Sequence, residues 1–215
     1  MSANDHQPAA TSASASGLEQ QLAFLVEADR LKSVLRQTTL CDGSRRENSA
    51  EHSWHLGLMA AVLAEHAADT VDAARVLRLL LVHDLVEIDA GDTFAYDAAA
   101  NMDREERELR AAERIFGLLP LQQGRELRAL WDEFEAQTTP EARVAVALDR
   151  LQPLLNNHHS NGGSWIAHGV SRAQVLRRME PIRTALPALW PAVEAIVARS
   201  CSLGHIHDEG GDEAR

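Results

Sequence analysis

Apolar residues recur at intervals of about three and four along most of the chain, the spacing of an α-helix with one buried face. The first such run comprises Leu18, Leu22, Leu25, Val26, Leu31, Val34 and Leu35. Valine and isoleucine clusters with a period of two, which would predict strands, are missing. The pattern therefore predicts an all-α fold with helices over residues 18–35, 47–67, 73–89, 103–117, 120–137, 140–155, 171–184 and 187–201.

Several residues mark where these helices begin and end. Asn48 can cap the second helix, and Glu51, three residues later, completes a capping box. Pro140 is a start signal, because proline is favoured at the first helical position. Pro153 should kink or end the same helix. Residues 156–169 then form the one long loop, which is either a lid that touches substrate or a surface loop.

The length and composition predict a single domain. A chain of 215 residues is long enough for one domain and short for two. Residues 1–17 are rich in alanine and serine, and residues 204–215 are polar, so both ends are predicted to be disordered tails. The predicted domain, residues 18–203, contains no internal repeat.

Charge and cysteine content narrow the partners and the compartment. The net charge of -11 argues against a nucleic acid polymer, since phosphate backbones attract clusters of lysine and arginine. No run of about 18 apolar residues predicts a membrane span, and the first residues lack the pattern of a signal peptide. Two cysteines provide no disulfide framework. We expect a cytoplasmic protein whose partner is a small molecule.

Residues 76–88, VLRLLLVHDLVEI, combine a core-like helix with charges. Nine of the thirteen residues are apolar and lie on every side of the helix, so it is predicted to be buried. His83, Asp84 and Glu87 lie within about one turn of each other. Burying unpaired carboxylates is costly unless an ion pair or a metal compensates. The compensating group is either a divalent cation or an arginine from another helix.

Two further polar residues stand out in apolar helices. His52 opens a helix that then becomes apolar, and Asp149 is the only acid in the stretch 142–155. Taken singly, His52 is equally consistent with a capping or core histidine, and Asp149 with an arginine partner. A metal needs three or four protein ligands. A two-histidine, two-aspartate site from three helices would consist of His52, His83, Asp84 and Asp149.

The ordered motifs ENSAEHSW, LVHDLVEIDAGD and ALDRL resemble those of the HD-domain superfamily of metal-dependent phosphohydrolases, and most closely its 5'-deoxynucleotidase branch. The resemblance extends from about Leu18 to about Leu155. It implies a compact, single-domain helical HD-domain fold with one catalytic divalent cation (Co, Mn, Zn, Fe or Mg). It also implies metal ligands at His52, His83, Asp84 and Asp149, catalytic roles for Glu87 and Asp92, and substrate binding by Arg36 and Asp92.

The chemistry of these residue types agrees with the implied roles. A carboxylate such as Glu87, next to the ligands without being one, can accept or relay the proton of an attacking water. The guanidinium of Arg36 is a planar fork that suits phosphate oxygens. The resemblance therefore implies hydrolysis of a nucleoside 5'-monophosphate by a metal-activated water.

Three questions remain open at the level of sequence. The branch carries an aromatic residue at or soon after its arginine, whereas Gln37 follows Arg36 here, so the sugar preference is undecided. Other substrates are a phosphodiester, an alarmone or a non-nucleotide phosphomonoester, and a non-catalytic metal- or nucleotide-binding module is a further alternative. We also expect a homodimer, for which the apolar helices after residue 171 could supply the contact face.

Overall fold

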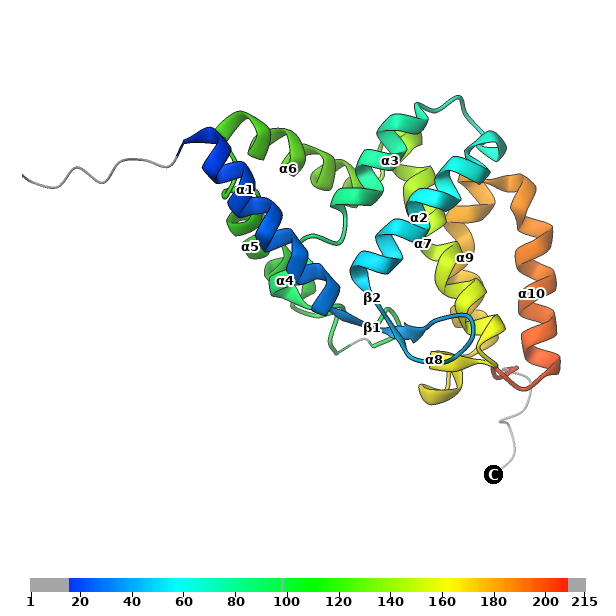
Figure 1. Ribbon diagram of the computed structural model, residues 1–215. Coiled ribbons are helices and arrows are strands. Elements are labelled where there is room, and N and C mark those ends of the chain that lie inside the picture. The colour runs from blue at the N-terminus through cyan, green and yellow to red at the C-terminus, as the bar shows by residue number, and fades with distance from the viewer. Residues whose placement is uncertain (1–15, 98, 209–215) are drawn as a thin grey trace, which may run out of the picture.

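The computed structural model describes residues 16–97 and 99–208, which form a helical domain with one small sheet (Figure 1). The predicted all-α fold in one compact domain is confirmed. The α-helices are α1 (Gly17–Ala28), α2 (Ser49–Leu63), α3 (Ala73–Val82), α4 (Glu87–Ala90), α5 (Arg104–Phe116), α6 (Leu121–Ala136), α7 (Pro140–His159), α8 (Gly163–Ala167), α9 (Arg172–Ala185) and α10 (Trp190–Ser202). The 3-10 helices are η1 (Asp29–Ser33), η2 (Ala64–His66) and η3 (Pro187–Leu189), and the strands are β1 (Leu35–Thr39) and β2 (Arg46–Asn48).

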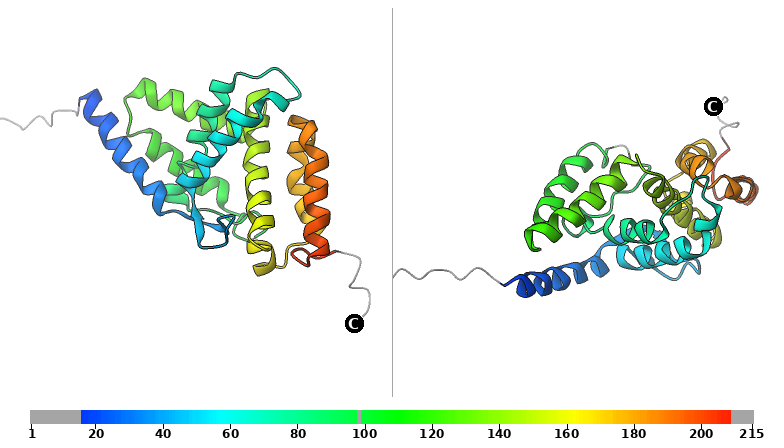
Figure 2. Two further views of the ribbon diagram at one scale, coloured as in Figure 1. Left: turned by 45° about the vertical axis from the view of Figure 1, so that its right-hand side comes forward. Right: turned by 90° about the horizontal axis from the view of Figure 1, so that it is seen from above.

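Helix α7 is the centre of the domain. It packs against α2, α3, α6 and α9, and Figure 2 shows it between α2 on one side and α9 and α10 on the other. Ala145, Ala147 and Leu148 are fully buried, because α7 has neighbours around most of its circumference. Any polar side chain on the inner faces of α7 is therefore removed from bulk water.

Pro153 does not end its helix, since α7 continues through it to His159, beyond the predicted end at residue 155. Proline removes the backbone donor for the carbonyl of residue 149. Packing of α7 against its neighbours on several sides compensates for that lost hydrogen bond. The predicted loop 156–169 accordingly holds the end of α7 and the short helix α8, whose Trp165 is buried.

The amino-terminal helical pattern is longer than the helix that forms. Helix α1 ends at Ala28, and β1 pairs antiparallel with β2 through Leu35 and Asn48 at one end and Thr39 and Arg46 at the other. These strands are too short for a period of two to be visible in the sequence. As a result Arg36 lies on a strand, whereas the sequence pattern predicted a helix.

The predicted helix over 73–89 is interrupted at the residues that carry charge. Helix α3 ends at Val82, and α4 begins at Glu87. Between them the backbone hydrogen bonds join residues three apart instead of four. The amide of Leu85 donates to the carbonyl of Val82 (3.1 Å), and the amide of Glu87 donates to the carbonyl of Asp84 (2.9 Å). In a regular helix consecutive side chains diverge by about 100°. The break allows both His83 and Asp84 to line one cavity.

The helix caps follow the sequence. Asn48 and Glu51 form the predicted capping box at the start of α2, which is confirmed. Pro140 is the first residue of α7, with Thr139 as its cap.

The packed structure extends beyond residue 203, the predicted end of the domain. Ile206 is 4% exposed, and the amide of His207 donates to the carbonyl of Val170 (3.2 Å). The remaining parts of the predicted tails, 1–15 and 209–215, lie outside the described residues. No helix among those that the structure describes is long and apolar enough to cross a bilayer.

Candidate active site

Three elements bring the predicted metal ligands together. His52 comes from the first turn of α2, His83 follows the last residue of α3, and Asp149 lies on α7. One ligand atom from each of these three buried residues lies within 4.8 Å of the others, an arrangement that can hold a metal ion. Asp84 completes the set, because its Oδ1 is 3.0 Å from Nε2 of His83 and its Oδ2 is 3.9 Å from Nε2 of His52.

The hydrogen bonds of the two histidines orient them as ligands. Nδ1 of His83 donates to the carbonyl of Leu80 (2.8 Å), and Nδ1 of His52 donates to Oε1 of Gln152 (3.1 Å). With the proton on Nδ1, a neutral imidazole presents the lone pair of Nε2.

Nε2 of His52 lies 2.9 Å from Oδ1 of Asp149, and Nε2 of His83 lies 3.0 Å from Oδ1 of Asp84. These oxygens repel a lone pair, so each pair of atoms needs a proton or a cation between them. Burial opposes a proton on His52, but Asp149 and Glu47 raise its pKa to about 9. A divalent cation can take the place of such a proton, so the residues fit a metal.

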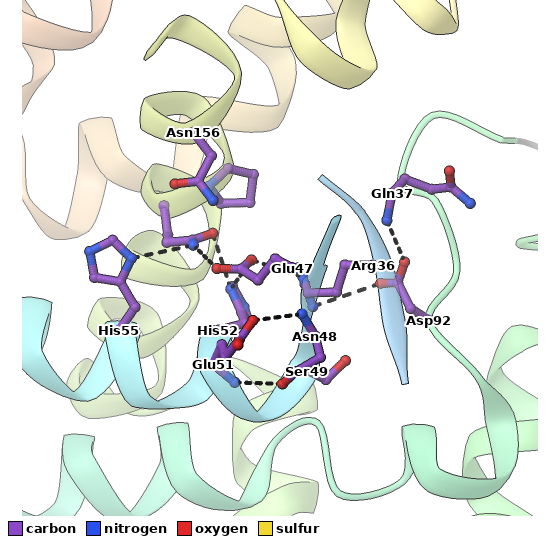
Figure 3. Close-up of polar contacts among 12 residues, drawn as sticks. Arg36, Gln37, Glu47, Asn48, Ser49, Glu51, His52, His55, Asp92 and Asn156 are labelled. Carbon is purple, nitrogen blue, oxygen red and sulfur yellow. Dashed lines mark hydrogen bonds and ion pairs between the residues drawn. The ribbon is translucent and has the colours of Figure 1, made fainter. Parts of the chain in front are cut away.

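Glu47 lies on the Nδ1 side of His52, and no sequence pattern indicated that it belongs to the site. Its Oε1 accepts from Nε2 of Gln152 (2.6 Å), and its Oε2 lies 3.6 Å from Nδ1 of His52 and 3.7 Å from Nε of Arg36. Figure 3 shows Glu47 between Arg36 and His52. Because a carboxylate only accepts, the amide nitrogen of Gln152 faces Glu47 and its oxygen faces His52. Gln152 follows Asp149 by three residues and so lies on the same face of the helix, which is the sequence signal that could have identified Gln152 as part of the site.

The Glu47→Gln variant is expected to bind its metal about 10- to 100-fold more weakly, the usual range for residues that orient a ligand. The substitution allows the amide of Gln152 to rotate, so His52 loses its fixed tautomer. Competition with a chelator measures the affinity. The exposed Glu65→Gln variant is the matched control, and equal affinities of the two variants would contradict the role of Glu47.

Both aspartates of the cluster are ionised. Burial opposes ionisation of Asp84, but His83 and Arg36 lower its pKa to about 2. For Asp149, burial is outweighed by Arg150, whose Nη1 lies 2.6 Å from Oδ2, and by His52, so that its pKa falls well below the usual value. Two carboxylates with two imidazoles thus form a cluster whose charge suits a divalent cation.

Glu87 differs from these two aspartates. It is 8% exposed and its Oε2 accepts from Oγ of Ser49 (2.6 Å). Burial, and then the charge of Asp84, raise the pKa of Glu87 well above its usual value. A carboxyl group with a raised pKa binds a proton more readily than an ordinary carboxylate does. Glu87 therefore has the environment of a general acid or base.

Arg36 and Asp92 lie together at the edge of the cluster. Nη1 of Arg36 donates to Oδ2 of Asp84 (3.0 Å) and lies 3.7 Å from Oδ1 of Asp92. Oδ2 of Asp92 accepts from the amide of Gln37 (3.3 Å), as Figure 3 shows. Gly91 has a φ of 73°, which favours glycine, and it turns the chain from α4 toward β1.

A cavity of about 240 Å³ is lined by Arg36, His83, Asp84, Glu87, Asp92 and Asp149. Its lining includes the aromatic side chains of Phe94, Tyr96 and Trp165. The ring centroids of Phe94 and Tyr96 lie 5.4 Å apart in an edge arrangement. Aromatic surface is thus present in the cavity although Gln37 follows Arg36. The cavity can hold a polar, charged group at the cluster and a flat ring at this wall.

Comparison with known proteins gives relatives along most of the chain. The HD-domain family model matches residues 28–190. The Mus musculus 5'-deoxynucleotidase HDDC2 is 33% identical, over 68% of this chain and 71% of its own length. The Homo sapiens 5'-deoxynucleotidase HDDC2 is 32% identical, over 65% of this chain and 67% of its own length.

Two solved structures are also similar to this chain. A "predicted metal-dependent phosphohydrolase" from Magnetospirillum magnetotacticum is 52% identical with a TM-score of 0.85, and the match covers 89% of this chain and 96% of that one. The PH0347 protein of Pyrococcus horikoshii shares the fold, with a TM-score of 0.58 and 20% identity over 85% of this chain and 99% of that one. Together with the buried histidine and aspartate cluster, these matches show that the chain belongs to the HD-domain family.

Proposed function

We propose that this chain is a metal-dependent phosphohydrolase that removes phosphate from nucleoside 5'-monophosphates. The observation that carries the proposal is the buried cluster of His52, His83 and Asp149, whose ligand atoms lie within 4.8 Å of one another. The cluster borders a cavity that is lined by His83, Asp84, Glu87 and Asp149. The relatives named 5'-deoxynucleotidase support a nucleotide substrate, and the aromatic wall of the cavity suits a nucleobase.

One divalent cation (Co, Mn, Zn, Fe or Mg) would be held by His52, His83, Asp84 and Asp149. When bound, such a cation supplies a water of lowered pKa and stabilises negative charge on phosphoryl oxygens. Two imidazoles and two carboxylates suit several first-row ions, so the metal present in the cell depends on availability as well as on affinity.

The remaining residues handle the proton and the substrate. Glu87 accepts the proton of the attacking water, because its carboxyl group lies in the same cavity as the ligands and burial raises its pKa above that of an ordinary glutamate. Arg36 contacts the substrate phosphate with the edge of its guanidinium that Asp84 leaves open. Asp92 holds Arg36 in position and thereby supports both binding and catalysis.

A panel assay tests the proposed function. Protein stripped with a chelator and resupplied with each metal is expected to release phosphate from nucleoside 5'-monophosphates, and the stripped protein is expected to release none. Paired ribose and deoxyribose substrates determine the sugar preference. Faster turnover of a phosphodiester, an alarmone or a non-nucleotide phosphomonoester would change the substrate. Tight nucleotide binding without phosphate release under any metal would support a non-catalytic module.

We also propose that the protein is a cytoplasmic homodimer, but with a different face from the one that the sequence suggested. The apolar residues after residue 171 pack in the core, since Val175, Ile182 and Val193 are fully buried. Large apolar side chains are instead exposed on α1 and α2, which lie along one side of the molecule (Figure 2). They are Leu18, Leu22, Leu25, Val26, Trp54, Leu58 and Val62.

The Trp54→Glu variant is expected to shift the dimer toward monomer, because it buries a charge at that face. Light scattering measures the mass in solution. The Leu203→Glu variant, at an exposed apolar position after α10, is the control. A monomeric wild-type protein would contradict the proposal. The cytoplasmic assignment is supported by the two cysteines, which are both free.

A further inference from the structure

We propose that Arg178, on α9, is a phosphate-binding residue of the active-site cavity. The identity of the anion rests on the function proposed above. No motif in the sequence indicates this residue, which lies outside the segments that carry the family resemblance.

The other three arginines of the cavity already have acidic partners. Arg36 Nη1 lies 3.0 Å from Asp84, Arg104 Nε 2.6 Å from Glu108, and Arg150 Nη1 2.6 Å from Asp149. Arg178 lines the same cavity but forms no hydrogen bond and no ion pair within residues 16–97 and 99–208. Its guanidinium therefore has its whole donor capacity available for a ligand.

The surroundings of Arg178 make an unpaired cation unfavourable. Burial, and then the charge of Arg150, lower the pKa of Arg178 to about 10. The group still carries its charge at neutral pH. Partly buried charges in proteins are normally paired, and here two guanidiniums from α7 and α9 face one cavity. An anion between them would replace this repulsion with two charge-assisted contacts.

The position relative to the metal ligands identifies the anion as the substrate phosphate. Asp149 connects the two regions, because its Oδ1 is 2.9 Å from Nε2 of His52 and its Oδ2 is 2.6 Å from Arg150. Arg150 is thus joined to the metal cluster through Asp149, and its charge acts on Arg178 in the same cavity. A phosphomonoester has three terminal oxygens, which can face a cation and arginines at once. Tyr96 and Trp165 line the same cavity and offer aromatic surface to the nucleoside that carries the phosphate.

Titration of inorganic phosphate into the metal-loaded protein tests the proposal. The Arg178→Gln variant is expected to bind phosphate about 10- to 100-fold more weakly than wild type, the usual effect of losing a charge-assisted hydrogen bond. KM for a nucleoside monophosphate is expected to rise by a similar factor, and binding of the uncharged nucleoside is expected to stay the same. Arg177→Gln, which removes a charge from an exposed neighbour on α9, is the matched control.

Thermal unfolding separates binding from a structural role. The Arg178→Gln variant is expected to melt at the wild-type temperature or above, because it removes an unpaired, partly buried cation. A structural arginine would lower the melting temperature. The Arg178→Lys variant keeps the charge without the planar fork, and its phosphate affinity is expected to fall between those of wild type and Arg178→Gln.

Failure of the Arg178 proposal and failure of the proposed function give different results. Equal phosphate affinities of Arg178→Gln and Arg177→Gln, or no phosphate binding by the wild-type protein, would overturn the role of Arg178. Failure of the wild-type protein to hydrolyse any nucleotide would overturn the proposed function. The phosphate titration is independent of turnover, so it decides on Arg178 in either case.

Discussion

The Glu87→Gln variant is expected to lose about 10²- to 10⁴-fold in kcat while it keeps its metal and its melting temperature. The change preserves shape, and Oγ of Ser49 can still donate to the new amide oxygen. It removes the group whose pKa is raised by burial and by Asp84. Because an amide cannot take up the proton of the attacking water, the loss appears in kcat more than in KM. Steady-state kinetics and metal analysis on the same preparation measure both.

The matched control for this prediction is Glu133→Gln. Glu133 is a helical glutamate outside the cavity, where it pairs with Arg75 and accepts from Thr139. This variant is expected to turn over at the wild-type rate. Wild-type kcat in Glu87→Gln would remove the proton-handling role. Loss of metal together with activity would instead make Glu87 a ligand.

The His83→Ala variant is expected to bind metal more than about 100-fold more weakly, beyond the upper end for residues that only support a ligand. Its Nε2 is buried 3.0 Å from Oδ1 of Asp84, in a geometry that forms no hydrogen bond among the described residues. Removing the ring leaves Asp84 and Asp149 with one imidazole fewer. Metal content after dialysis, measured by elemental analysis, and phosphate release at saturating metal are both expected to fall.

His66→Ala is the control for this ligand variant, because His66 lies on the exposed helix η2. It removes an imidazole without touching the cluster, so metal content is expected to match wild type. Metal retained by His83→Ala at the wild-type level would contradict the two-histidine, two-aspartate site. The metal would then be bound at another position, and an ion-pair network between these acids and Arg36 would be favoured here.

The regular parts of the fold could be predicted because their signals are local. Asn48 and Glu51 satisfy each other across three residues, and the periodicity of α5 and α6 gave their bounds to within about one residue. The errors occurred where distant packing outweighed local preference. Pro153 lies inside α7 because neighbouring helices hold it there, and the run from Leu18 to Leu35 divides into α1, η1 and β1.

The candidate ligands could be predicted for a related reason. A charged residue in an apolar helix is visible in sequence because burial without compensation is costly, so His83 and Asp84 stood out. Gln152 and Arg178 did not, since glutamine and arginine are ordinary residues on helix surfaces. Their significance comes from partners on other elements, or from the lack of such a partner.

The sequence by itself determined the helical class, most helix bounds and the residue types that could hold a metal, because each depends on the spacing of neighbours along the chain. The tertiary structure alone decided which groups meet. It broke the helix at His83, moved Arg36 onto a strand facing Asp84 and Asp92, and gave Arg178 no ion-pair partner among the described residues, in the same cavity as Arg150. These outcomes depend on distances between elements that α7 holds together, and such distances are fixed only when the core packs.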